Sequence, residues 1–219
     1  MKAFFLGAVG LVLLLAVAAS AAPAGQTGAD LDRKVRAFLD GHAGQWRDMN
    51  VSEADGKILY DIIIKNRYTR ALEIGTSTGH SGIWIAWALS KTGGRLITVD
   101  IDEGRHREAA ANFREAGLDA FIDARLADAH ELVPALPGPF DFVFCDADKD
   151  WYKNYFIAVL PKLTVGGVFA AHNVSPRQRG RGWGSASFVE YVLSLPNMET
   201  TFAEGSWAGL SVSTKKAEK

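Results

Sequence analysis

The fold of this chain is decided by the stretch RALEIGTSTGHSG, residues 70–82. Residues 70–74 predict a short strand, and the residues after the turn predict a helix. Between them, Gly75 and Gly79 allow the backbone to approach a ligand closely, and the start of the following helix favours negative charge. The spacing differs from the dinucleotide pattern G-x-G-x-x-G, and many α/β folds need such a turn for geometry alone. The turn therefore predicts a strand–turn–helix unit without assigning its ligand.

The rest of the chain repeats this alternation. Strands are predicted at residues 70–74, 95–99, 121–126, 140–145, 167–171, 199–202 and 210–213, and helices at 30–43, 52–63, 83–89, 103–116, 130–135, 151–163 and 185–195. This order predicts an α/β fold, a doubly wound, mostly parallel, seven-stranded sheet with an antiparallel hairpin at one edge. Ligands bind such a sheet outside the carboxyl ends of its strands, where the strand order reverses.

An acidic residue stands at one of those ends. Asp100 closes the second predicted strand, 25 positions beyond Gly75. A carboxylate there can accept hydrogen bonds from both hydroxyls of a ribose, although such an acid can also simply cap the next helix. Together with the Gly75 turn, Asp100 indicates an adenosine-containing ligand without a strong pyrophosphate site. S-adenosylmethionine fits that description better than NAD.

Polar residues also follow the fourth and fifth predicted strands. Asp146 lies in the segment CDADKD, residues 145–150, and His172 and Asn173 follow the fifth strand. One carboxylate, one imidazole and one amide can converge there on a cation. Lys149 lies one turn further on, where a metal or burial would lower its pKa enough for general-base work. Taken singly, these residues are explained by a solvated acidic loop and a core histidine, but their position at paired strand ends favours a functional site.

These motifs together resemble a known family. Residues 46–174 resemble the cation-dependent O-methyltransferases, which include catechol and caffeoyl-CoA O-methyltransferases. MNV at 49–51 with Gly56 resembles the stretch before the domain in the catechol enzymes, LEIGTSTGHS their first cofactor motif, VDID their ribose-binding acid and DADKDWY their metal-and-base segment. The resemblance implies a Rossmann-like methyltransferase fold and S-adenosylmethionine-dependent O-methylation.

The resemblance also implies roles for individual residues. Lys149 would be the catalytic base, and the metal ligands would be Asp146 and Asn173, with His172 at the remaining position. The cofactor would be bound by Met49, Val51, Glu73, Gly75, Ser81, Asp100, Asp128, Ala129 and Asp146.

His172 departs from the family pattern, which usually has Asp at this position. A neutral imidazole is a softer ligand than a carboxylate and suits zinc, iron, nickel or copper better than magnesium. It also removes one negative charge from the site. The expected divalent metal is therefore either magnesium or a transition ion.

Composition and the N-terminus set the wider context. A chain of 219 residues fits one α/β domain, here 30–219 behind a linker at 22–29, and a net charge of −1 argues against a nucleic-acid partner. The single cysteine, Cys145, rules out an internal disulfide. An apolar run from Ala3 to Ala19, followed by the small residues 19–21, predicts a signal peptide cleaved after Ala21 or a retained membrane anchor at 1–21. The domain is therefore expected to be exported or membrane-anchored, with membrane contact only through this segment.

The expected reaction follows from these assignments. A metal would hold two vicinal oxygens of a small catechol-like or phenolic substrate, Lys149 would remove one hydroxyl proton, and the oxyanion would attack the sulfonium methyl group in line. The loop at 177–184 would either cover the substrate or be simply a solvated loop, and a homodimer is an open option. Two alternatives stay open: a cofactor-binding protein with little or no turnover because of His172, and a metal-independent methyltransferase.

Overall fold

The computed structural model describes residues 27–46, 49–178 and 184–218. The predicted leader or anchor at 1–21 lies outside these residues, as do positions 179–183 of the loop expected over the substrate. Within the described ranges, no helix is both long and apolar enough to cross a membrane.

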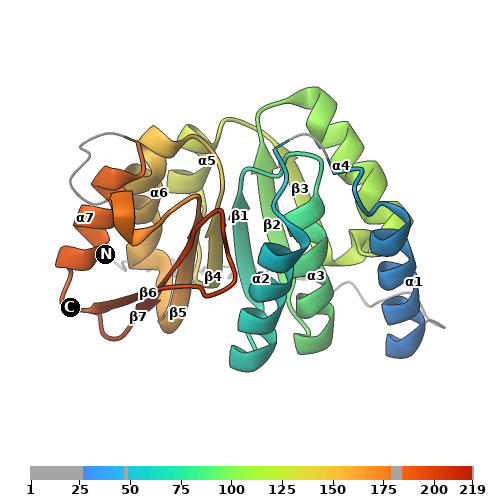
Figure 1. Ribbon diagram of the computed structural model, residues 1–219, viewed down its shortest axis with the longest axis horizontal. Coiled ribbons are helices and arrows are strands. Elements are labelled where there is room, and N and C mark those ends of the chain that lie inside the picture. Colours follow the sequence, from blue (N-terminus) through green and yellow to red (C-terminus); the bar gives the residue numbers. More distant parts are fainter. Residues whose placement is uncertain (1–26, 47–48, 179–183, 219) are drawn as a thin grey trace, which may run out of the picture.

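A seven-stranded sheet forms the centre of the molecule (Figure 1). The strands are β1 (Arg70–Ile74), β2 (Arg95–Asp100), β3 (Ile122–Leu126), β4 (Phe140–Cys145), β5 (Leu163–His172), β6 (Met198–Phe202) and β7 (Leu210–Lys215). Their order is β3-β2-β1-β4-β5-β7-β6; the pairs from β3 to β5 are parallel, and β7 pairs antiparallel with both β5 and β6. The order reverses between β1 and β4. The predicted doubly wound sheet with an antiparallel edge is thereby confirmed, and its ligand crevice is expected at the ends of β1 and β4.

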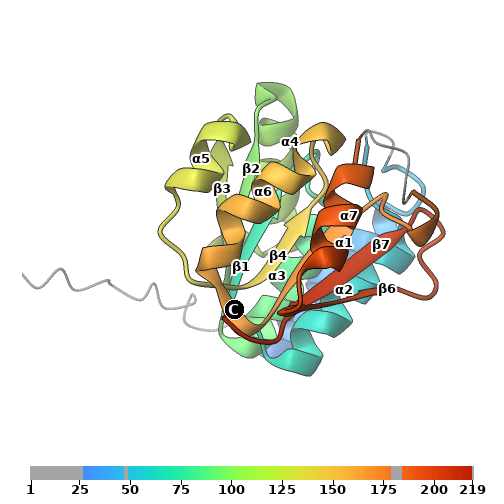
Figure 2. The same cartoon turned by 90° about the vertical axis from the view of Figure 1, so that its left-hand side faces the viewer.

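Helices cover both faces of the sheet (Figures 1 and 2). One layer holds α1 (Gly28–Gly41), α2 (Glu53–Asn66), α3 (His80–Thr92) and α4 (Glu103–Ala116), and the other holds α5 (Ala129–Ala135), α6 (Tyr152–Val159) and α7 (Ala186–Ser194). Short 3₁₀ turns are η1 (Asp119–Phe121), η2 (Lys149–Trp151), η3 (Leu160–Lys162) and η4 (Pro176–Gln178). Side chains alternate along β1, so Ala71 joins the core under α2 and α3, whereas Leu72 and Ile74 join the core under α5 to α7.

Two local features determine the position of the ligand crevice. Ser52 caps α2, its hydroxyl accepting from the Asp55 N–H at 3.1 Å. Gly75 has φ +97°, and a Cβ there would lie 2.6 Å from the carbonyl oxygen of Asp146. The ends of β1 and β4 therefore approach so closely that only glycine fits between them.

Some predicted boundaries were wrong. Helix α1 begins at Gly28 rather than at residue 30, because Thr27 and Asp30 form a capping box, so the last two linker residues are helical. The helix predicted at 151–163 stops at Val159 and tightens into η3. Pro161 has no N–H to continue an α-helix, and β5 begins at Leu163, four residues earlier than predicted.

Candidate active site

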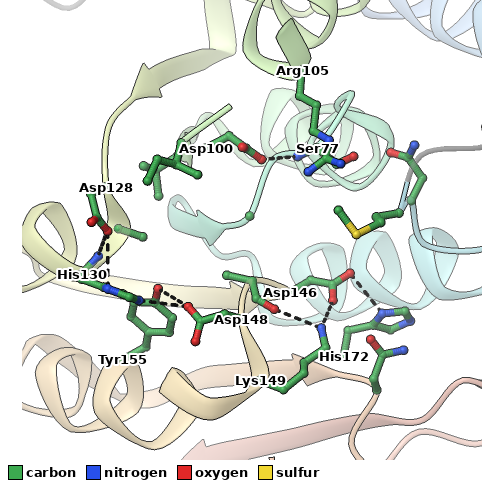
Figure 3. A pocket seen from close by; sticks show the side chains of 18 residues that line it. Ser77, Asp100, Arg105, Asp128, His130, Asp146, Asp148, Lys149, Tyr155 and His172 are labelled. Atoms are coloured by element: carbon green, nitrogen blue, oxygen red, sulfur yellow. Dashed lines mark hydrogen bonds and ion pairs between the residues drawn. The ribbon is translucent and has the colours of Figure 1, made fainter. Parts of the chain in front are cut away.

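A cavity of about 610 Å³ lies at the carboxyl ends of the parallel strands, around the point where the strand order reverses (Figure 3). That volume lies within the usual range of small-molecule sites. The lining residues come mainly from the loops that follow β1, β2, β3, β4 and β5. They are Met49, Asn50, Gly75, Ser77, Val99, Asp100, Ile101, Arg105, Asp128, Ala129, His130, Asp146, Ala147, Asp148, Lys149, Tyr155, His172 and Asn173.

The Gly75 turn and Asp100 form one side of the cavity. The Ser77 N–H donates to Asp100 Oδ2 at 2.7 Å, and the Asp102 N–H donates to Asp100 Oδ1 at 2.9 Å. Ser77 itself has φ +46°, a conformation that non-glycine residues seldom adopt. These two backbone donors hold the Asp100 carboxylate in place. Each oxygen keeps a second lone pair, so the group can still accept hydrogen bonds from a diol.

Glu73 lies beneath this turn, fully buried, and is not in the cavity wall. Its Oε2 accepts from the Thr98 hydroxyl at 2.6 Å, and its Oε1 has no hydrogen-bond partner among the described residues. Burial raises the pKa of Glu73 to about 7, although hydrogen bonds from Ser81 and Thr98 oppose the shift. A carboxyl group at this depth exchanges its proton near neutral pH.

A second wall is built from the end of β3 and the segment after β4. The His130 N–H donates to Asp128 Oδ1 at 2.8 Å, and the His130 Nε2 lies 3.0 Å from Asp148 Oδ2. Tyr155 donates its hydroxyl hydrogen to the same Asp148 oxygen at 3.1 Å. The His130 ring stacks on Trp151 with centroids 3.7 Å apart. The labelled side chains in Figure 3 show this group facing Asp100 across the cavity.

Lys149 stands at the floor of the cavity. Its ammonium donates to Asp146 Oδ1 at 2.6 Å and to the Tyr152 hydroxyl oxygen at 2.8 Å, and the side chain is 36% exposed. Burial raises the pKa of Tyr152 well above its ordinary value. Tyr152 therefore stays protonated, and it donates in turn to the His172 carbonyl oxygen at 3.2 Å. Lys149 also donates to the Ala147 carbonyl oxygen at 3.2 Å, so three acceptors orient its nitrogen while the side chain stays partly exposed to the cavity.

His172 lies between two carboxylates from distant elements. Its Nδ1 is 3.1 Å from Asp146 Oδ2, and its Nε2 is 3.3 Å from Oδ2 of Asp55, a buried residue of α2. Burial lowers the pKa of His172, but Asp146 and Asp55 outweigh it and raise the pKa to about 9. Burial likewise opposes ionisation of Asp55, yet hydrogen bonding by His172 and two serines brings that pKa down to about 2. In the metal-free protein the imidazole therefore carries a proton that neutralises buried negative charge.

The same residues offer donors to a metal. Across residues 27–46, 49–178 and 184–218, no three His, Cys, Asp or Glu side chains are grouped so as to hold an ion. However, His172 Nδ1 is a buried atom without a hydrogen-bond partner in those ranges, it lies beside Asp146 Oδ2, and Asn173 lines the same cavity. A carboxylate, an imidazole and an amide are donors that first-row transition ions accept. The donor set therefore fits such an ion when solvent or substrate supplies its other ligands.

Comparison with known proteins identifies sequence similarity to methyltransferases. Residues 72–174 match a family model described as a methyltransferase domain. The chain is 38% identical over 130 residues to a catechol O-methyltransferase of Niastella koreensis, covering 58% of each chain, and 31% identical over 140 residues to a caffeoyl-CoA O-methyltransferase of Medicago sativa, covering 58% of this chain and 54% of that one. The chain thus spans little more than half the length of these curated relatives.

Solved structures agree with this match. An O-methyltransferase of Bacillus cereus in complex with SAH superposes with a TM-score of 0.71 at 28% identity, over 84% of this chain and 91% of that one. TomG, an O-methyltransferase of Streptomyces achromogenes in complex with SAM, gives 0.68 at 25% identity, over 85% and 91%. In sequence and fold, this chain is similar to class I S-adenosylmethionine-dependent O-methyltransferases. The predicted resemblance to the catechol and caffeoyl-CoA O-methyltransferases is confirmed by this similarity.

The structure brings most of the predicted O-methyltransferase residues together. The cavity wall includes Met49, Gly75, Asp100, Asp128, Ala129, Asp146, Lys149, His172 and Asn173. Val51, Glu73 and Ser81 lie behind that wall and are buried. The Val51 carbonyl oxygen lies 2.9 Å from His80 Nδ1. These three residues support the lining, so any role they have toward a ligand is exerted from beneath it.

Several residues of the cavity were not predicted from the sequence. Ser77 was hidden within the turn, and its role depends on a positive φ that the sequence does not display. His130 and Tyr155 lie in segments predicted as helices, and Asp148 lies in the segment that resembles the metal-and-base motif. No separate role was predicted for these three residues. Asp55 lies near the start of the helix predicted at 52–63, and nothing in the local sequence links it to His172.

Proposed function

We propose that this protein transfers the methyl group of S-adenosylmethionine to a hydroxyl group of a small catechol-like or phenolic substrate. The observation that carries the proposal is the single cavity with two chemically different sides. One side presents the Gly75 turn and the anchored Asp100 carboxylate, which suit an adenosine ribose. The other presents Lys149, Asp146, His172 and Asn173, which suit the hydroxyl group that accepts the methyl group.

Methyl transfer requires a deprotonated oxygen aligned with the sulfonium methyl carbon. Lys149, as the free amine, would take the hydroxyl proton, after which the oxygen bonds to the methyl carbon and the carbon–sulfur bond breaks, leaving a neutral thioether. The exposed side of Lys149 gives its proton a path to solvent, and Asp146 and Tyr152 hold the nitrogen in one position. Fixing both reactants within one cavity supplies part of the rate through orientation alone.

Asp146, His172 and Asn173 would hold a divalent metal, which would supply Lewis-acid chemistry that favours ionisation of the substrate hydroxyl. A metal-independent reaction is the second candidate, favoured by the raised pKa of His172. As an imidazolium ion between Asp146 and Asp55, His172 would itself supply positive charge beside the substrate oxygen.

The experiment is methyl transfer from S-adenosylmethionine to catechol by purified protein, with and without EDTA, detected by mass spectrometry of the product. Methylated catechol that disappears with EDTA and returns with added metal supports the metal-assisted reaction. Methylation insensitive to EDTA supports the second candidate. Cofactor binding by calorimetry without any methylated product would leave a cofactor-binding protein with little turnover.

A further inference from the structure

Asp55 carries a buried carboxylate at the start of α2. Its place beside the Ser52 cap of that helix explains only part of this burial. Its side chain is 1% exposed, and it reaches from the first turn of α2 to the end of β5, 117 positions away in the chain. Ser52 donates its hydroxyl hydrogen to Asp55 Oδ2 at 2.8 Å, and Asp55 Oδ1 has no hydrogen-bond partner among the described residues. Burying a carboxylate costs several kcal/mol unless it is paired. Ser52 could cap α2 equally well if the side chain of Asp55 were exposed to solvent. The contact with His172 therefore explains why the Asp55 carboxylate is buried.

That contact leaves Nδ1 of His172 as the nitrogen available to an ion. An ionised carboxylate can only accept hydrogen bonds, and one lies beside each ring nitrogen: Asp146 Oδ2 at 3.1 Å from Nδ1, and Asp55 Oδ2 at 3.3 Å from Nε2. The protonated ring therefore donates on both sides, and when an ion takes the place of the Nδ1 hydrogen, Asp55 holds the remaining hydrogen on Nε2. In the neutral ring the lone pair is then on Nδ1, on the side of Asp146. Carboxylates commonly fix the tautomer of metal-binding histidines in this way.

The other side of the ring has the spacing of two atoms that share an ion. Nδ1 and Asp146 Oδ2 are 3.1 Å apart, and Nδ1 has no hydrogen-bond partner in the described part of the chain. Two atoms bound side by side to one ion, with bonds of about 2.1 Å, lie about 3 Å from each other. Two lone pairs facing each other at this distance repel unless a proton or a metal cation lies between them, so an ion bound here would take the place of the shared proton.

We propose that Asp55 is a positioning residue that fixes the tautomer of His172 and so makes Nδ1 a donor to a transition ion shared with Asp146. The inference rests on the metal-assisted form of the proposed function, and it assigns the choice of metal to a residue outside the cavity. The Asp55–His172 pair acts as one unit: the imidazole selects late first-row ions over magnesium, and the buried carboxylate orients it.

The first test reads the tautomer directly in the full chain. Nitrogen NMR of isotope-labelled histidine, with the His172 signals assigned through His172→Gln, is recorded before and after saturation with Zn²⁺. The expected result is an Nδ1 signal shifted by zinc and an Nε2 that keeps its hydrogen. Zinc that leaves both His172 nitrogens unchanged, or that binds Nε2, overturns the proposal without any variant of Asp55.

The second test removes the carboxylate. Asp55→Ala should weaken Zn²⁺ binding, measured by calorimetry, by roughly 10–100-fold, the usual effect of losing such a partner. Asp55→Asn keeps an oxygen that accepts from Nε2 and should fall between Asp55→Ala and the unchanged chain. Ser52→Ala is the matched control, because it removes the helix cap and leaves the carboxylate. Equal zinc affinity in all four folded proteins, with folding checked by circular dichroism, overturns the proposal.

Titrating the same samples with S-adenosylmethionine separates this inference from the proposed function. Failure of the cofactor to bind rejects the proposed function while the zinc data still decide the role of Asp55. Normal cofactor binding with an unchanged His172 spectrum rejects the role of Asp55 and leaves methyl transfer in place.

Discussion

Replacing Glu73 with Gln should change how the stability of this protein depends on pH. Glu73 is fully buried, and burial raises its pKa from the ordinary 4.5 to about 7. Each pKa unit corresponds to about 1.4 kcal/mol, so the shift amounts to about 3 kcal/mol. Between pH 4.5 and about pH 7 the folded protein holds a proton that the unfolded chain has already released. The free energy of unfolding therefore falls as pH rises through this window and levels off above it.

Gln at position 73 cannot ionise, so the free energy of unfolding of the variant does not fall in this way as pH rises. Relative to the unchanged protein, Glu73→Gln should gain about 3 kcal/mol of stability between about pH 4.5 and pH 8. Urea unfolding followed by circular dichroism at several pH values in this range measures the difference. Glu108→Gln is the control, because Glu108 is exposed on α4 and its replacement should run parallel to the unchanged protein. A Glu73→Gln curve that is equally parallel would show that Glu73 is ionised inside the fold and refute the reasoning.

Three further outcomes are expected around the cavity. Asp100→Ala should weaken S-adenosylmethionine binding by about 1–3 kcal/mol, because the ribose hydroxyls lose their acceptor; unchanged affinity by calorimetry would remove Asp100 from the site. Lys149→Ala should lower kcat by about 10²–10⁴-fold with near-normal cofactor affinity, whereas full turnover would place the base elsewhere. His172→Asp, made together with Asp55→Asn to avoid two adjacent buried carboxylates, should shift metal preference from nickel or zinc toward magnesium in methyl-transfer titrations; an unchanged ranking would exclude His172 as a ligand.

The sequence was sufficient for the sheet and for residues at strand ends. Apolar strands alternating with amphipathic helices have few packing solutions, so the strand ends that carry Asp100, Asp146 and His172 had to meet at one edge. The Gly75 turn was equally readable, since a glycine between a buried strand and a helix indicates a close approach, here to the Asp146 backbone.

What could not be predicted depends on contacts between elements far apart in the chain. Asp55 and His172 are separated by 117 positions, and only the packing of α2 beside the end of β5 brings them together. The grouping of His130 with Asp148 and Tyr155 likewise depends on how α5 packs on α6. Local propensity misplaced the start of β5, because Pro161 ends the preceding helix early and β5 begins directly after it, at Leu163.

In the proposed function, one cavity binds S-adenosylmethionine beside a site that binds a metal and accepts a proton. A crystal structure of the protein grown with S-adenosylmethionine and Zn²⁺ tests it most directly, because the difference density locates both ligands independently. The ribose hydroxyls are expected within hydrogen-bond distance of Asp100, and zinc is expected to be bound by Asp146, by Nδ1 of His172 and by Asn173. Cofactor density away from Asp100, or zinc bound at any place other than beside His172, would contradict it.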